Sequence, residues 1–175
     1  MKKVQFSEGF YKHLYDTIMD GAGSVEYDNE KDGYPDTFYV DGYAVDVTVS
    51  YGWEVHDDSF DHAFGTWHDP CPYMEAEYLD DIDTVKVYEE ETNEEVDGFD
   101  YDAFMSQFEE PSCLVYYHDT ERKCYRKVKV ESGDKVLWLG REATFLANNK
   151  ENGKLKVRTD KGTYYADPKK VTIVA

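Results

Sequence analysis

Cysteine is scarce in this sequence, with only Cys71, Cys113 and Cys124 among its 175 residues. An odd number without a regular spacing excludes a disulfide scaffold and is typical of reduced thiols in the cytoplasm. Long apolar runs are missing too. No segment is long enough to span a membrane, and the initial Met-Lys-Lys is not followed by the apolar core of a signal peptide. We therefore expect a cytoplasmic protein with no membrane association.

Basic residues are almost absent from the first two thirds of the chain. Residues 1–110 contain five Lys or Arg against thirty Asp or Glu, a net charge of −25. Residues 111–175 contain fourteen against eight, a net charge of +6. The acidic part disfavours direct binding to nucleic acid or to an anionic membrane, and it favours a basic protein surface or metal ions. The alternative is that the charge only keeps the protein soluble.

Apolar residues, by contrast, are plentiful. They make up 41% of the chain, and the aromatic residues comprise sixteen Tyr, nine Phe and three Trp. This is enough to build a core, so the acidic part is not expected to be a disordered tail.

The start of the chain predicts a short amphipathic helix. Ser7 is placed to cap the free amides of its first turn. Apolar residues then recur at helical spacing from Phe10 to Ile18, and Gly21 and Gly23 end the pattern.

An antiparallel sheet is predicted to follow. Asp-Gly after Val40 is typical of a tight hairpin turn. Pairing Val40 with Tyr43 places Phe38 and Val45 on the same apolar face. The alternation of apolar and polar residues continues to Val55, which indicates one long, half-buried strand.

A second short helix is predicted after the charged segment 89–95. Its apolar stripe comprises Tyr101, Phe104, Met105 and Phe108. Pro111 ends it, and residues 113–117 and 124–130 predict another hairpin. We therefore predict an acidic α+β domain over residues 1–130, an antiparallel sheet with two short helices.

Residues 131–175 differ in composition and predict a second domain. Five short strands are expected, at 136–139, 143–147, 155–158, 163–165 and 171–174. Asn152-Gly153 and Lys161-Gly162 supply tight turns, and a single helical turn at Asp167-Pro168-Lys169-Lys170 precedes the last strand. This strand spacing resembles the SH3-like small barrels, which include KOW and Tudor-like modules. The resemblance implies a small SH3-like β-barrel, a fold that does not by itself define a function.

Two segments are candidate metal sites. His56, His62 and His68 recur every six residues, and with Cys71 they form a candidate zinc-ligand set. No Cys-x-x-Cys or His-Glu-x-x-His pair fixes this geometry, so a surface loop is the alternative.

The second segment is Asp28-Asn29-Glu30-Lys31-Asp32-Gly33, which begins like a calcium loop. Tyr39 stands at the twelfth position, where a glutamate is expected, and a plain polar turn is the alternative. Zinc and calcium are therefore the candidate ions.

No catalytic arrangement is evident, because a Gly-x-Ser-x-Gly turn and a phosphate-binding glycine loop are both missing. The most distinctive remaining feature is a dense acidic set. It comprises Asp80, Asp81, Asp83, Glu89, Glu90, Glu91, Glu94, Glu95 and Asp97. Carboxylates held on a sheet can imitate the phosphates of nucleic acid, and a partner with an Arg/Lys groove would relieve their repulsion.

We therefore predict a non-enzymatic interaction protein that presents a shaped acidic surface to a basic partner. A nucleic-acid-binding protein is one such partner, and by analogy the chain would then be a phage or mobile-element inhibitor. One alternative is a metal-binding protein or metal-dependent enzyme that uses residues 56–71. The other is a structural or assembly component of a larger particle.

Overall fold

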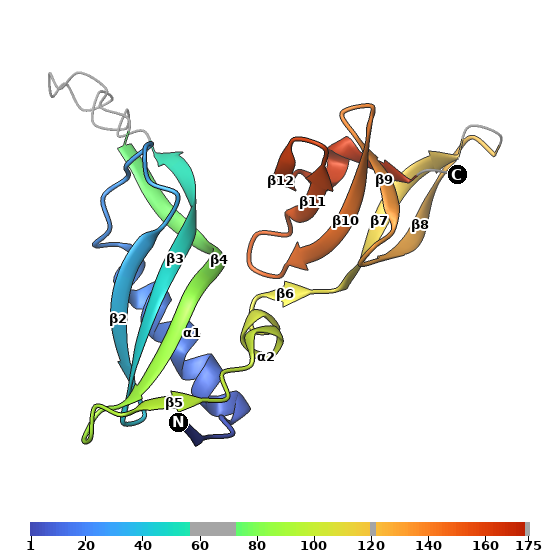
Figure 1. Ribbon diagram of the computed structural model, residues 1–175. Helices are drawn as coiled ribbons and strands as arrows, with labels where there is room; N and C mark the ends of the chain where they lie inside the picture. The colour runs from blue at the N-terminus through green and yellow to red at the C-terminus, as the bar shows by residue number, and fades with distance from the viewer. Residues whose placement is uncertain (57–72, 120–121, 174–175) are drawn as a thin grey trace, which may run out of the picture. The chain divides into compact units, whose positions relative to one another are not determined.

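The computed structural model describes residues 1–56, 73–119 and 122–173 (Figure 1). The chain forms two compact units, Met1–Gln107 and Phe108–Ala175. The described residues form thirteen strands in three sheets. No helix within these ranges is long and apolar enough to cross a membrane.

The first unit is built on a five-stranded sheet. Its strands are β1 (Lys2–Lys3), β2 (Tyr34–Val40), β3 (Tyr43–His56), β4 (Tyr73–Glu89) and β5 (Glu95–Asp97). They lie in the order β1-β5-β4-β3-β2, with β1 parallel to β5 and the other pairs antiparallel. β2 pairs with β3 as far as Val49, whereas β3 and β4 remain paired to His56. The two strands thus continue as a ribbon, which we call the outer ribbon (residues 51–56 and 73–79; Figure 1).

The predicted hairpin between β2 and β3 is confirmed. Val40 pairs with Tyr43, and Phe38 pairs with Val45 on the buried face. The turn residue Asp41 and the glycine after it have φ angles of 50° and 82°. Positive φ at both central positions is what a two-residue turn between twisted strands requires, so the Asp-Gly pair sets the register of the sheet.

The first predicted helix is also confirmed, as α1 (Glu8–Ala22). The side chain of Ser7 accepts a hydrogen bond of 3.1 Å from the backbone N–H of Phe10, which caps the helix start. Leu14 and Ile18 are completely buried, and α1 contacts β2 and β4. Burial of each side chain contributes about 1.5–3 kcal/mol. The helix therefore covers one face of the sheet and does not cover the opposite face.

The second unit contains the remaining strands. They are β6 (Glu109–Glu110), β7 (Ser112–Asp119), β8 (Cys124–Glu131), β9 (Lys135–Trp138), β10 (Arg141–Asn149), β11 (Leu155–Thr159), β12 (Gly162–Ala166) and β13 (Val171–Ile173). One sheet has the order β12-β11-β10-β9-β13, with β6 paired to β10, and β7 and β8 form a separate hairpin. The predicted helical turn before the last strand is present as η2 (Pro168–Lys170).

The predicted α+β class is wrong, because the protein is mainly β. Among the described residues, α1 is the one helix of more than two turns. The second predicted helix is reduced to α2 (Tyr101–Met105), which the side chain of Asp100 caps through the backbone N–H of Ala103. Phe108 lies beyond α2, and its carbonyl accepts a hydrogen bond from the backbone N–H of Lys150. This bond joins Phe108, the last residue of the predicted apolar stripe, to the second sheet. The helix therefore ends at Met105 and does not continue through Phe108.

The predicted SH3-like barrel is wrong as well, since the described residues of the second unit form no closed barrel. The five strands lie where they were predicted, but among the described residues no pairing joins β12 to β13. The β7–β8 hairpin covers the apolar face instead: Val115 and Val130 are buried in one cluster with Phe145 and Val157. The same packing places this hairpin in the second unit, whereas the sequence analysis assigned it to residues 1–130.

One ion pair is nearly buried within the second unit. Lys156 Nζ lies 2.9 Å from Glu109 Oε1, and both side chains are 13% exposed. The hydroxyl of Tyr165 donates to the same carboxylate oxygen at 3.1 Å. The pair connects β6 to β11 and β12, so part of the basic charge of this unit serves its own packing.

Candidate protein-binding surface

The charge asymmetry of the sequence follows the division into units. Residues 1–107 contain five Lys or Arg and twenty-eight Asp or Glu, a net charge of −23. Residues 108–175 contain fourteen and ten, a net charge of +4. Three of the five cations in the first unit, at positions 2, 12 and 31, are in ion pairs with carboxylates of the same unit. The first unit therefore carries a strong negative field on a folded surface.

The nine acidic residues predicted as a binding set lie on β4, on β5 and in the turn between these strands. Six of them are exposed: Asp83, Glu90, Glu91, Glu94, Glu95 and Asp97. The other three, Asp80, Asp81 and Glu89, are partly buried. The structure thus brings the set together around one hairpin, as the sequence suggested, but its members are not equivalent.

Two of the partly buried carboxylates have partners inside the unit. Glu89 forms an ion pair with Lys2, and this contact lowers the pKa of Glu89 and raises the pKa of Lys2. Asp81 accepts a hydrogen bond from the hydroxyl of Tyr101. These carboxylates help to hold β1 and α2 against the sheet, so we assign them a structural role.

The turn after β4 is held by several hydrogen bonds. The backbone N–H of Glu89 donates to the carbonyl of Glu94 at 3.0 Å, and that of Asn93 donates to the carbonyl of Glu89 at 2.8 Å. Asn93 has a φ of 55°, a conformation that asparagine tolerates better than most residues. Glu90 and Glu91 are exposed and therefore project from a turn whose backbone is fixed by hydrogen bonds.

A depression between β4 and β5 gathers part of the acidic set with aromatic side chains. Its volume is about 360 Å³. The charged and aromatic residues that line it are Asp83, Lys86, Glu95, Asp97, Phe99 and Tyr101. We call this feature the acidic depression. Tyr101 is 41% exposed, so its ring is accessible beside the carboxylates.

Sequence reasoning missed the two aromatic residues of the acidic depression. Tyr101 was placed in the apolar stripe of the second helix, and Phe99 belonged to no pattern. Periodicity could not reveal their role, because Phe99 lies in the short segment between β5 and α2 and Tyr101 is the first residue of α2. The one signal in the sequence that could have indicated Phe99 and Tyr101 is that they follow Glu95 and Asp97 within a few positions.

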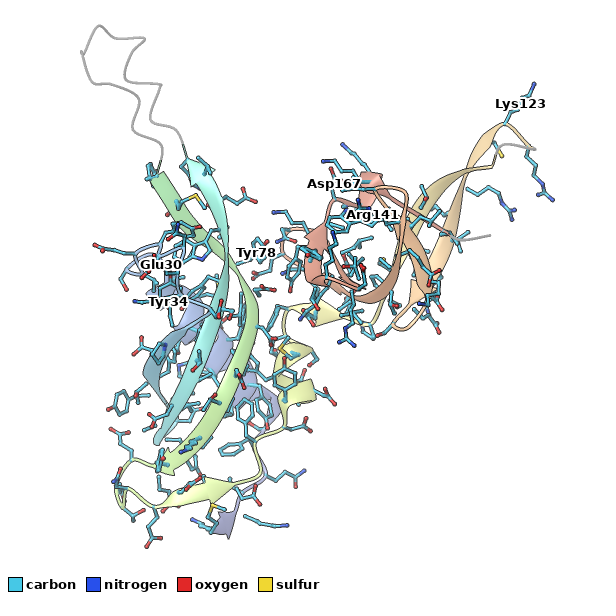
Figure 2. The ribbon with its side chains drawn as sticks, turned by 45° about the horizontal axis from the view of Figure 1, so that its top comes forward. Glu30, Tyr34, Tyr78, Lys123, Arg141 and Asp167 are labelled. Carbon is cyan, nitrogen blue, oxygen red and sulfur yellow. The ribbon has the colours of Figure 1, made fainter. Side chains whose placement is uncertain are left out.

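The segment predicted as a calcium loop, residues 28–33, has a local structure in which Asp28 contacts neighbouring residues of the same turn. Asp28 Oδ1 accepts a hydrogen bond of 3.0 Å from the backbone N–H of Glu30, and Asp28 Oδ2 lies 3.9 Å from the ammonium of Lys31. Among the described residues, the carboxylates at 28, 30 and 32 do not converge as metal ligands would. Figure 2 labels Glu30 and Tyr34 where this segment leads into β2.

Aromatic rings flank this polar turn. Lys31 Nζ lies 5.3 Å from the centroid of the Tyr34 ring. Trp53 contacts both Tyr34 and Tyr27, with centroid distances of 5.7 and 5.3 Å. Aromatic contacts with Trp53 therefore hold the segment before β2 against the outer ribbon.

The predicted zinc-ligand set is only partly within the described residues. His62, His68 and Cys71 lie outside the described ranges. His56 is the last residue of β3, where its ring nitrogen lies near the carboxylates of Glu75 and Glu77 on β4. The sequence analysis did not include these two glutamates. Their spacing on a strand that returns antiparallel to His56 could have indicated them.

The chain matches no known protein family, no curated protein and no solved structure.

Proposed function

We propose that the protein is a non-enzymatic binding protein whose first unit presents the acidic depression to a basic surface of another protein. The observation that carries this proposal is the composition of that depression. Three carboxylates, those of Asp83, Glu95 and Asp97, line one cavity with two aromatic rings, the ammonium group of Lys86 and the N-terminal residue Met1. Such a site has a net negative charge and an apolar wall, which suits the side chain of an arginine or a lysine.

The energetics favour a partner with arginine. A guanidinium group forms paired hydrogen bonds with a carboxylate and stacks on an aromatic face, so Asp97 and Tyr101 can contact it at the same time. Aromatic residues and arginine are also the most frequent anchors of protein interfaces. Binding would relieve the repulsion among neighbouring carboxylates, which favours the complex further.

A nucleic-acid-binding protein is the partner class that this chemistry supports best. Proteins that hold phosphates do so with grooves of Arg and Lys. The backbone of β5 and of the turn before it is held by hydrogen bonds, so the carboxylates that project from it can occupy such a groove in place of phosphates. This class predicts that duplex DNA or RNA competes with the protein for its partner. In this proposal the complex forms in the cytoplasm.

The test is affinity capture from the source cells with matched baits. The first variant, Glu95→Lys/Asp97→Lys, reverses two carboxylates of the acidic depression. The control, Glu26→Lys/Glu30→Lys, makes the same change in net charge at two exposed positions before β2. We expect a basic protein to be retained by the wild type and the control at low salt, released at high salt, and lost from the first variant. Equal retention by both variants would contradict the proposal.

A further inference from the structure

A second cluster of side chains lies on the outer ribbon, away from the acidic depression. Nε2 of His56 lies 2.5 Å from Oε1 of Glu77 and 3.6 Å from Oε2 of Glu75. The three candidate ligand atoms lie within 4.8 Å of one another. Among the described residues, this is the one group of His, Cys, Asp or Glu side chains that converges in this way.

The strand pairing explains why these three residues meet. His56 pairs with Tyr73, so Glu75, two residues further along β4, lies on the same face. The register then shifts between the pairs Gly52–Tyr78 and Trp53–Ala76, which leaves Glu77 as the extra residue of a β-bulge. A bulge redirects a side chain, and here it adds a second carboxylate to the histidine.

The surroundings orient the histidine and concentrate negative charge. The ring of His56 stacks on that of Tyr73, with a centroid distance of 5.5 Å and an interplanar angle of 22°. Glu54 lies directly opposite Glu75 in the register. Like charges in directly opposed positions destabilise a strand pair, so a bound cation would stabilise this end of the ribbon.

We propose that His56, Glu75 and Glu77 form a binding site for a divalent transition-metal ion, with Zn²⁺ as the best match. Imidazole favours zinc and its neighbours over magnesium and calcium, and carboxylates complete the ligand set. Ligands about 2.1 Å from a tetrahedral zinc ion lie about 3.4 Å apart. The distances of 2.5 and 3.6 Å bracket this value, so shifts of about 1 Å suffice to bind the ion.

This site differs from the zinc set predicted from the sequence. It keeps His56 but replaces the residues at 62, 68 and 71 with two glutamates from the facing strand. The three side chains are partly exposed, so water completes the coordination shell.

The test is zinc titration of the full chain by isothermal calorimetry, with magnesium titrated separately. We expect one zinc ion to bind to the wild type, and we expect no heat of binding with magnesium. Glu75→Gln/Glu77→Gln removes both carboxylates at constant size and should weaken zinc binding by at least about 100-fold. Glu90→Gln/Glu91→Gln makes the same charge change on the exposed turn and should bind zinc like the wild type.

A third variant separates the two zinc hypotheses. His62→Ala/His68→Ala/Cys71→Ala removes the ligands predicted from the sequence and should retain one bound zinc ion. In the wild type, the NMR signals of the His56 ring should shift on addition of zinc. The proposal is overturned if the wild type binds no zinc at millimolar concentration, or if Glu75→Gln/Glu77→Gln binds zinc as tightly as the wild type.

Discussion

The stability of the outer ribbon should depend on a glycine beneath a tyrosine ring. Gly52 pairs with Tyr78 across β3 and β4, and Tyr78, labelled in Figure 2, is 6% exposed. A Cβ atom added at Gly52 would lie 2.0 Å from Cζ of Tyr78. Carbon atoms in contact are normally about 3.5–4.0 Å apart, so the ring would have to move by about 1.5 Å or more. We therefore expect Gly52→Ala to displace the ring from its packed position.

The size of this effect follows from the burial of the ring. Overpacking costs about 1–3 kcal/mol, and removal of a buried aromatic side chain costs about 3–5 kcal/mol. The lower chain entropy of alanine in the unfolded state offsets about 0.4–1 kcal/mol. We expect Gly52→Ala to lower the free energy of unfolding of the first unit by about 2 kcal/mol. Tyr78→Ala should lower it by about 3 kcal/mol, and the double variant should be no less stable than Tyr78→Ala alone.

The assay is urea denaturation followed by tryptophan fluorescence. Trp138 lies in the second unit, so all variants are made in a Trp138→Phe background, which removes the signal of that unit. A double-mutant cycle then gives the coupling between positions 52 and 78, which we expect to be about 2 kcal/mol. A loss below about 0.5 kcal/mol for Gly52→Ala, or additive losses in the double variant, would refute the proposed contact.

Three further predictions concern titration and charge. Burial raises the pKa of Tyr51 from 10.0 to about 12. Its contribution to stability is therefore complete below pH 10 and is lost as the pH rises towards 12. Relative to Tyr51→Phe, the free energy of unfolding of the wild type should fall by about 2–3 kcal/mol over this interval in urea titrations. Lys156→Met leaves Glu109 as a nearly buried, uncompensated carboxylate. It should lower the free energy of unfolding of the second unit by about 2–3 kcal/mol in thermal or urea denaturation, and Lys156→Met/Glu109→Gln should recover part of the loss. In NMR titrations the carboxylate of Glu89 should have a pKa below its usual value, because Lys2 and the hydroxyl of Thr92 both donate to it. Its contribution to stability is therefore present above about pH 4.5 and is lost at lower pH. Lys2→Met should raise the pKa of Glu89 towards its usual value, and no change would argue against the ion pair.

Local signals predicted much of the fold. Ser7 and the spacing from Phe10 to Ile18 located α1, and Asp-Gly after Val40 set the pairing of β2 with β3. These features depend on interactions between residues that are close together in the sequence, so a single sequence is enough to predict them. The shortening of the second helix and the open second sheet depend on distant contacts, such as the hydrogen bond between Phe108 and Lys150 and the burial of Val115. No periodicity within a segment encodes such contacts.

The candidate sites show the same distinction. The density of acidic residues in the sequence indicated the acidic set, but it did not show that its members have different roles. In the structure Glu89 is paired with Lys2, whereas Glu95 and Asp97 line the acidic depression. The sequence indicated His56 as a metal ligand and suggested partners along the chain. Its neighbours in space are instead Glu75 and Glu77, because β4 returns beside β3 and a bulge shifts the register. Long-range pairing therefore decides which residues act together.

We propose that the acidic depression, rather than net charge alone, binds basic partners. The most direct measurement is the affinity of the full chain for a fluorescent arginine-rich peptide, determined by anisotropy at low and moderate salt. We expect Glu95→Lys/Asp97→Lys to weaken binding by about 30-fold at either salt concentration, whereas Glu26→Lys/Glu30→Lys should weaken it only a few-fold, and less at moderate salt. Equal losses of affinity for the two variants at both salt concentrations would show that net charge alone, and not the acidic depression, determines binding.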